Sequence, residues 1–518
     1  MRSFRLLCAL IITVTLTSFP CGERTEPAYA AETTPVIDVS RRDDPDVKNL
    51  SETLSHFIMG QVYENAGMPS AALREYNEAL GTDKSIPEIY IKIGTSQMLS
   101  GNTAEAIESL EKAIDLDREQ VKAYLLLALI YTSKGQFTKA QTQHERALKV
   151  DPDNIKVLTF LSDLYIIQQK LGEAADVYEK ILDIRPNDPF VYFNLGIIYS
   201  KLNDFNKAVD RLQKAIEIDR EYLEAHMVLG FLYEITGEDR EAVDEYREVI
   251  QLDESNADAR GRLGRLYRKM GQTEKALEQN RQLMSLKKGE PEPYLRNFGI
   301  YVSNKEYGKA EDILRKAIDN GVTASVVYGS LGYLSGLRGR HEQAAEYYGK
   351  ALRKEPGEQT YRFFLAVSLE RAGKENEAVE ILEKMTGEED ALPEALNYLG
   401  YLYVEQGKHL DRAVELIERA LEKKPDNGAY LDSLGWAYFK KGEFEKAAEE
   451  LEKAAEMLPI DPEIREHLGE VYYSMGRKRE ALEQWRLSFS IDPDNEKLEK
   501  KIRRVEKELS EQNLKEKD

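Results

Sequence analysis

A unit of 34 residues recurs along most of the chain, and this period constrains the fold more than any other feature of the sequence. Units begin at residues 53, 87, 121, 155, 189, 223, 257, 291, 325, 359 and 393. Two more begin at 428 and 462, because the unit that starts at 393 carries one extra residue near Lys408. The thirteenth unit ends at Asn495. A sequence period of about 20–50 residues predicts a stacked array of supersecondary units rather than one compact core.

Small residues stand at fixed positions within the unit. Position 20 is alanine in all thirteen units, and position 8 is glycine, alanine or serine in twelve, with Phe298 as the exception. Position 11 is tyrosine in ten units. We interpret each unit as two antiparallel helices whose backbones approach closely at positions 8 and 20. A large residue at position 24, such as Tyr76, Tyr246 or Trp485, then fills the space between units. One helix pair cannot bury its apolar face alone, so the units must stack.

This pattern resembles that of the tetratricopeptide repeat family over residues 53–495. The resemblance implies an all-α, right-handed superhelical solenoid of about thirteen helix-turn-helix units. Beyond it, Leu498, Ile502, Val505 and Leu509 recur at helical spacing among charged residues. Residues 496–518 are therefore predicted to form a charged capping helix on the last unit.

Length and charge agree with an array. A chain of 518 residues exceeds the size of about 250–300 residues at which single cores stop growing. The net charge is −21, whereas a nucleic-acid-binding protein needs a cationic surface to displace counterions from phosphates. Nucleic acid is therefore excluded as the expected partner.

The first thirty residues have the layout of an export signal. Arg2 and Arg5 precede the apolar run Leu6–Leu16, and Ala28-Tyr29-Ala30 has the small-residue pattern of a cleavage site. We expect residues 1–30 to be a signal peptide and the protein to be exported to the periplasm or cell envelope. Residues 31–52, rich in threonine and charge, are expected to be a flexible tether.

Lipidation at Cys21 is the alternative to cleavage after Ala30. It would attach the chain to a membrane, and Gly22 suits it, but Ser18-Phe19-Pro20 is a poor approach to a bacterial lipidation site. The chain has two cysteines, Cys8 and Cys21, and both precede Ala30. Cleavage there would leave a mature chain without disulfides or thiol ligands.

No catalytic, metal or cofactor motif is present. The six histidines show no metal-ligand spacing, and the chain lacks the phosphate-binding, dinucleotide-binding and nucleophile motifs. We therefore predict no catalytic residue, no metal, no cofactor and no enzymatic activity. The expected partners are proteins or peptides.

Family geometry places positions 2, 5, 9, 12 and 13 of each unit on the concave surface. Units three to six carry apolar residues there, which predict a trough for a partner segment: Leu125, Leu129, Phe190, Phe193, Ile197, Met227 and Phe231. The alternative is that curvature of the array tucks some of these side chains between helices.

Two further groups stand at such positions. Arg265, Arg268 and Lys269 of unit seven form a basic spot that fits a carboxylate, or else a solvated face balanced by nearby acidic residues. Units nine to twelve present aromatic residues with two polar neighbours: Tyr333, Phe363, Tyr401, Trp436, Phe439, Asn397 and Asp432. Tyrosine and tryptophan are common interface anchors, and packing between units is the alternative.

The segment from Ala395 to Ser488 resembles one subfamily in particular. Its runs ALNYLGY (395–401), AYLDSLGWAYFKKGEFEKAAEELEKA (429–454) and HLGEVYYSMGRKREALEQW (467–485) are similar to the C-terminal part of bacterial envelope tetratricopeptide proteins, many of which are outer-membrane lipoproteins. One of these is the adaptor of a periplasmic carboxyl-terminal processing protease. The resemblance implies an envelope adaptor or scaffold. A structural component of an exopolysaccharide export or outer-membrane biogenesis complex is the second hypothesis, and an enzyme with an unrecognised site the third.

Overall fold

The computed structural model of the protein describes residues 45–515. The predicted signal peptide, Cys21 and residues 31–44 of the predicted tether lie outside that range. Within it, all regular secondary structure is α-helical. The helices fall into two compact units, one up to Ile218 and one from Asp219, which are described separately.

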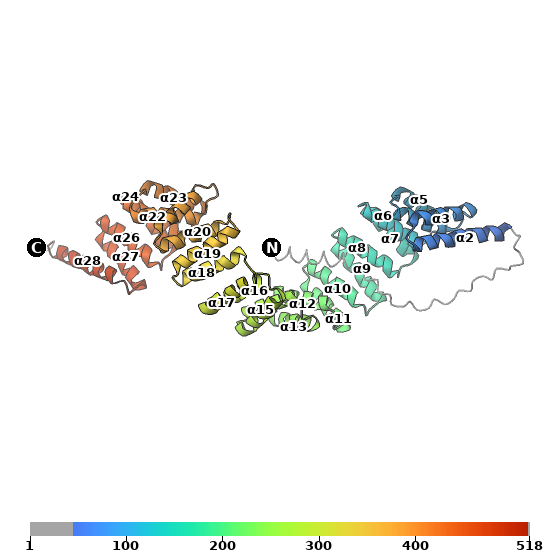
Figure 1. The fold of residues 1–518 in the computed structure, drawn as a ribbon, viewed down its shortest axis with the longest axis horizontal. Helices are drawn as coiled ribbons and strands as arrows, with labels where there is room; N and C mark the ends of the chain where they lie inside the picture. The colour runs from blue at the N-terminus through green and yellow to red at the C-terminus, as the bar shows by residue number, and fades with distance from the viewer. Residues whose placement is uncertain (1–44, 516–518) are drawn as a thin grey trace. The chain divides into compact units, whose positions relative to one another are not determined.

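The first unit pairs consecutive helices, most of which are labelled in Figure 1. Its helices are α2 (Pro45–Asn65), α3 (Pro69–Thr82), α4 (Pro87–Leu99), α5 (Thr103–Leu116), α6 (Val121–Ser133), α7 (Phe137–Val150), α8 (Ile155–Ile167), α9 (Leu171–Ile184), α10 (Pro189–Lys201) and α11 (Phe205–Ile218).

The second unit continues the same alternation of first and second helices. It contains α12 (Leu223–Thr236), α13 (Asp239–Leu252), α14 (Ala257–Lys269), α15 (Thr273–Leu286), α16 (Glu292–Ser303), α17 (Tyr307–Asp319), α18 (Ser325–Leu337), α19 (His341–Lys354) and α20 (Gln359–Arg371). It ends with α21 (Glu375–Thr386), α22 (Pro393–Gln406), α23 (Leu410–Lys423), α24 (Gly428–Lys441), α25 (Phe444–Met457), α26 (Pro462–Ser474), α27 (Lys478–Ile491) and α28 (Glu496–Lys515).

The repeat boundaries follow the sequence period. First helices begin at the predicted positions 87, 121, 155, 189, 223, 257, 325, 359, 393, 428 and 462, and α16 begins one residue late, at Glu292. The first repeat differs from expectation, because α2 begins at Pro45 rather than at residue 53. Residues 45–52, which we expected to be flexible tether, are therefore helical.

Local chemistry explains where helices start. The side-chain oxygen of Asn154 accepts a hydrogen bond from the Val157 backbone N–H at 3.1 Å, and Asp188 caps α10 in the same way. Such caps satisfy backbone donors that have no partner inside the helix. Proline stands in the first turn of α10, α22 and α26, where its missing N–H costs no hydrogen bond.

The inserted residue of the unit from 393 lies between α22 and α23. Gly407 and His409 both adopt positive φ angles there, 63° and 51°. Two left-handed residues in one short connection let the chain absorb an extra position without shifting either helix out of register. The left-handed region is sterically costly for a residue with a Cβ atom, so His409 marks the place where the insertion strains the backbone.

The small residues at positions 8 and 20 do bring the paired helices together. Ala106, Ala208 and Ala447, all at position 20, are fully buried. A Cβ added to Gly469 would lie 2.3 Å from Nε1 of Trp485, the large residue at position 24. Phe298, the exception at position 8, is only half-buried and packs against a smaller cluster.

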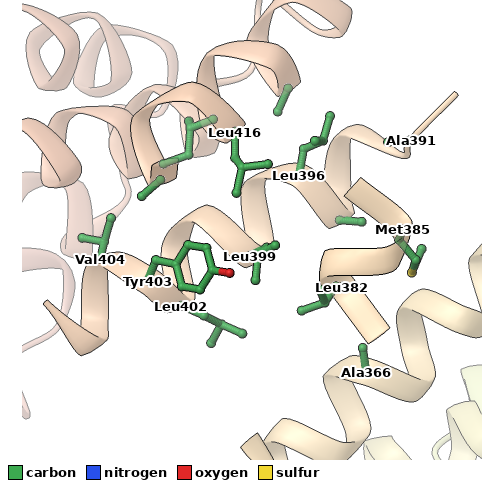
Figure 2. Packing of buried hydrophobic residues seen from close by; sticks show 14 of the residues in the cluster. Ala366, Leu382, Met385, Ala391, Leu396, Leu399, Leu402, Tyr403, Val404 and Leu416 are labelled. Carbon is green, nitrogen blue, oxygen red and sulfur yellow. The ribbon is translucent and has the colours of Figure 1, made fainter. Parts of the chain in front are cut away.

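A buried apolar cluster links successive repeats of the second unit. Figure 2 shows Ala366 of α20, Leu382 of α21, Leu399 of α22 and Leu416 of α23 meeting in one such cluster. At the C-terminal end, Leu498, Ile502 and Val505 of α28 pack with Trp485 of α27 in another. The last helix thus covers apolar surface that the thirteenth repeat would otherwise expose.

Contacts between helices are almost entirely local in sequence. The extensive ones join consecutive helices, and smaller ones join the first helices of successive repeats, such as α4 with α6, α22 with α24 and α24 with α26. Among residues 45–515, no helix combines the length and apolar character needed to cross a bilayer.

Candidate functional site

First helices α6 and α8 border an open apolar cleft in the first unit, which we call the α6–α8 cleft. It has a volume of about 300 Å³. Six of the eleven residues in its walls are leucine, isoleucine or phenylalanine, and five are polar or charged: Lys122, Leu125, Leu126, Leu129, Thr132, His144, Lys156, Phe160, Asp163, Leu164 and Ile167. Leu129 is 55% exposed and Ile167 is 54% exposed. Large apolar side chains gathered on an exposed surface are typical of an interaction site.

Two titratable side chains line the same cleft. Burial raises the pKa of Asp163 to about 6 and lowers the pKa of His144 to about 4, because it disfavours the charged form of each group. His144 is buried, and its Nδ1 atom has no hydrogen-bond partner in the described residues. Near neutral pH the imidazole is therefore uncharged, whereas the carboxyl group changes charge near pH 6 rather than near pH 4.

Only two of the seven predicted apolar groove residues, Leu125 and Leu129, line the α6–α8 cleft. Of the others, Phe190 is exposed, Phe193 is buried, and the rest are half-buried: Ile197, Met227 and Phe231. The Arg262 guanidinium carbon lies 4.9 Å from the ring centre of Phe231, so that ring is partly covered. Phe160, at position 6 of its unit, belongs to the cleft and was missed, because the expected concave positions did not include position 6.

The basic spot lies at a second cavity, between α14, α15 and α16, which we call the Arg265 pocket. Its volume is about 500 Å³. It is lined by Gly264, Arg265, Arg268, Asn280, Pro291, Glu292, Leu295, Arg296 and Ile300. The structure thus brings Arg265 and Arg268 together but not Lys269, whose Nζ pairs with Asp239 Oδ1 at 2.7 Å. Sequence reasoning missed Arg296 and Asn280, which come from neighbouring helices.

The charges of the Arg265 pocket are unevenly paired. Arg296 donates to the Gly261 carbonyl oxygen at 2.8 Å and to Glu292 at 2.5 Å. Within the described residues, neither Arg265 nor Arg268 has an ion-pair partner. The pKa of Arg265 is lowered, because the side chain is partly withdrawn from solvent and the Arg296 guanidinium lies nearby. Asn280 is 2% exposed, and its Oδ1 has no hydrogen-bond partner.

The predicted aromatic residues split into separate groups. The Trp436 ring is stacked against Phe439, with centroids 4.7 Å apart, and against His467 of the next repeat, at 4.0 Å. Its Nε1 donates to Glu405 Oε1 at 3.0 Å. Trp436 therefore packs between repeats. Phe363 instead meets Tyr398 edge-on at 5.8 Å, and Tyr333 is exposed on α18.

Polar groups accompany the Trp436 stack. Asp432 pairs with His467, and burial together with the Glu405 charge raises the pKa of Tyr401 to about 12. Burial also raises the pKa of Glu463. The Oδ1 atom of Asn397 is buried and has no hydrogen-bond partner in the described residues.

No group of three histidine, cysteine, aspartate or glutamate side chains in the described residues is arranged to hold a metal ion. Each of the three sites has its own chemical character: apolar surface in the α6–α8 cleft, unpaired guanidinium groups in the Arg265 pocket, and stacked rings around Trp436.

Comparison with family profiles agrees with the repeat architecture. Tetratricopeptide repeat profiles match residues 97–164, 158–221, 193–257, 257–289 and 433–495, and the profile of the Psidin N-terminal repeat region matches residues 338–458. The chain belongs to the tetratricopeptide repeat family. Such repeats form scaffolds for protein–protein interaction, and that is the class of protein defined here.

Individual relatives are distant. The human protein O-mannosyl-transferase TMTC1 is 29% identical over 143 residues, which are 28% of this chain and 16% of that protein. The chain therefore spans about one sixth of that relative. Among solved structures, Naa15/Naa10 bound to HypK is similar over 84% of this chain and 68% of that one, with 17% identity and a TM-score of 0.43. Yeast Tom70 is similar over 89% of this chain and 97% of that one, with 15% identity and a TM-score of 0.37.

Proposed function

We propose that the protein is a non-catalytic adaptor of the bacterial cell envelope that binds partner polypeptides along the first helices of its repeats. The α6–α8 cleft is the observation that carries this proposal. Leu129 and Ile167 are more than half exposed, and Phe160 adds a ring 37% exposed. Covering such surface stabilises a complex by about 25 cal/mol for each Å² of apolar area removed from water.

The cleft supports binding better than the aromatic residues do. Trp436 and Phe439 are stacked on each other, and Trp436 is also stacked on His467, so these rings already have partners within the chain. In the cleft, by contrast, Leu129, Phe160 and Ile167 are exposed. An apolar segment of a partner, either extended or helical, would fit there, with its own polar face directed towards solvent.

The envelope location rests on the N-terminal sequence. The basic start, the apolar run and Ala28-Tyr29-Ala30 together support export. The resemblance of residues 395–488 to envelope proteins supports the adaptor role. Fractionation of host cells tests the envelope location. The protein should be recovered in the periplasmic or membrane fraction, and recovery in the cytosol would contradict this location.

The binding role is tested by affinity capture from an envelope extract, with partners identified by mass spectrometry. Leu129→Ser with Ile167→Ser should lose at least one partner that the wild-type chain retains. Leu116→Ser with Val150→Ser is the matched control, because both side chains are exposed, lie at the ends of second helices α5 and α7 of the same unit, and do not line the cleft. Equal recovery with wild type and the cleft variant would contradict the proposal.

A further inference from the structure

A carboxyl group stands between two exposed apolar side chains on the wall of the α6–α8 cleft. Phe160, Asp163 and Ile167 follow one another at spacings of three and four residues on α8, so they share one face of that helix. All three line the cleft. Within residues 45–515 the Asp163 carboxyl group forms no hydrogen bond or ion pair, and burial is the cause of its raised pKa. The cleft therefore holds a negative charge that the chain itself leaves unpaired.

The two lysine residues of the cleft do not neutralise this charge. Nζ of Lys122 pairs with Oε1 of Glu88 on α4, 3.3 Å away. Nζ of Lys156 lies over the ring of Phe160, 6.0 Å from the ring centre. Neither lysine lowers the pKa of Asp163. An anionic occupant would be repelled by the Asp163 carboxylate, so the charge in the cleft favours a cation.

His144 adds a second, independent requirement from α7. Its side chain is 4% exposed and lines the cleft, and its Nδ1 atom has no hydrogen-bond partner in the part of the chain that the structure describes. In a neutral imidazole with the proton on Nε2, Nδ1 is an acceptor. A wholly apolar occupant would bury both this acceptor and the Asp163 carboxylate without partners, which is unfavourable. A cationic nitrogen carries several N–H donors and can satisfy both groups.

We propose that the α6–α8 cleft binds a partner segment in which a basic side chain is flanked by aliphatic ones. Asp163 pairs with the cationic group, and His144 Nδ1 accepts one of its N–H hydrogen bonds. Leu129 and Ile167 contact the flanking aliphatic side chains. This inference rests on the proposed adaptor function and deepens it, because it states which partner sequences the cleft selects. It also gives a role to a half-buried carboxyl group whose unpaired charge destabilises the free protein.

The experiment measures binding of fluorescein-labelled nonapeptides to the purified full-length chain by fluorescence polarisation at about pH 7.5. Each peptide has leucine two positions before and two positions after its central residue, so that in an extended segment the three side chains point the same way. The central residue is lysine, norleucine or glutamate, and every peptide ends in an amide. Norleucine keeps the four-carbon stem of lysine without the ammonium group. Salt at about 0.15 M screens the long-range attraction of a net charge of −21 for cations.

The lysine peptide should bind at least about tenfold more tightly than the norleucine peptide, because the Asp163 carboxylate is charged at this pH. The glutamate peptide should bind most weakly. Asp163→Asn should abolish the preference for lysine over norleucine. Asp183→Asn is the matched control, because Asp183 is exposed on α9 and does not line the cleft, and it should keep the preference. Thermal melting followed by circular dichroism checks that both variants are folded.

Leu129→Ser with Ile167→Ser separates the apolar contact from the charge. This variant should bind the lysine and norleucine peptides more weakly than wild type does, with the lysine peptide still the tighter of the two. Three results would each overturn the inference: wild type binding norleucine as tightly as lysine, Asp163→Asn keeping the lysine preference, or no binding of the lysine peptide up to about 1 mM. Loss of partner capture by the serine variant would still support the adaptor function in each case, so the two proposals fail separately.

Discussion

Nδ1 of His467 lies 2.9 Å from Oδ1 of Asp432, and the two residues come from the first helices of successive repeats, α26 and α24. Burial of the imidazole opposes its charge, but the hydrogen bond and the negative charge of Asp432 outweigh it, so the pKa of His467 is raised. The pair therefore joins two repeats most strongly while His467 is protonated.

Asp432→Asn should lower the pKa of His467 and weaken this link. Because the folded-state pKa is raised, the ion pair contributes its full stability below the unfolded value of about 6.5, and the contribution is lost as pH rises through the folded pKa. The difference in melting temperature between wild type and variant should thus be largest near pH 6 and shrink at higher pH. Titration of the imidazole proton signals by NMR measures the pKa directly, and unchanged titration in the variant would contradict the assignment.

Gly469→Ala should destabilise the protein by about 1–3 kcal/mol. The added methyl group would lie 2.3 Å from Nε1 of Trp485, a fully buried side chain that has no room to retreat. Gly349→Ala is the matched control, because Gly349 lies inside α19 with open space around it. That change should stabilise the protein by about 0.5–1 kcal/mol, since alanine favours a helix more than glycine does. Chemical denaturation measures both, and equal effects would refute the close-approach explanation.

Asp163→Asn should stabilise the protein above pH 6 and have little effect near pH 4. The pKa of Asp163 is raised to about 6 by burial, because the folded state disfavours the charged carboxylate. Wild-type stability attributable to this group therefore falls as pH rises from the unfolded value near 4 through the folded value near 6. Thermal melts across this range should show the two proteins diverging. Asp183→Asn, at an exposed position on α9, is the control, and its melting temperature should change with pH as that of the wild type does. The same pH dependence for Asp163→Asn and wild type would contradict the prediction.

Leu498→Ala should cost about 2–5 kcal/mol of local stability, because it leaves a cavity against Trp485 in the terminal cluster. Leu498 is fully buried, whereas Lys500 on the same helix is exposed, so Lys500→Ala serves as the control. Hydrogen exchange should show faster opening of α27 and α28 in the leucine variant, with α22 and α23 unaffected. Faster exchange spread evenly over the second unit would argue against a local capping role.

Most of the architecture follows from residue spacing. Alanine at position 20 and glycine at position 8 fix where two helices touch, so the helix starts at Pro87, Val121 and Pro189 were predictable from a sequence period alone. Pro45 was not, because residues 45–52 precede the first repeat and carry none of its marker positions. Composition alone favoured a tether there.

The candidate sites were predictable only in part, because they depend on what neighbouring repeats bring to the same surface. Arg265 and Arg268 stand at concave positions, but Arg296 and Asn280 complete the pocket from other helices. Lys269 was predicted with them and instead reaches Asp239 of the preceding repeat. The sequence predicted Trp436 to be an interface anchor. In the structure, His467, 31 residues further along the chain, is stacked on its ring. The rotation between successive repeats determines which side chains of neighbouring repeats come into contact. This rotation cannot be deduced from the residue positions within a single unit.

The short range of the helix contacts has a mechanical consequence. Since helices pack mainly against their neighbours in sequence, separating one repeat from the end of the array breaks few distant contacts, and unfolding under load should proceed unit by unit. Each 34-residue repeat would release about 110–120 Å of extended chain. A protein that tethers partners through such an array would lengthen in small steps under tension while its remaining repeats stay folded and keep hold of what they bind.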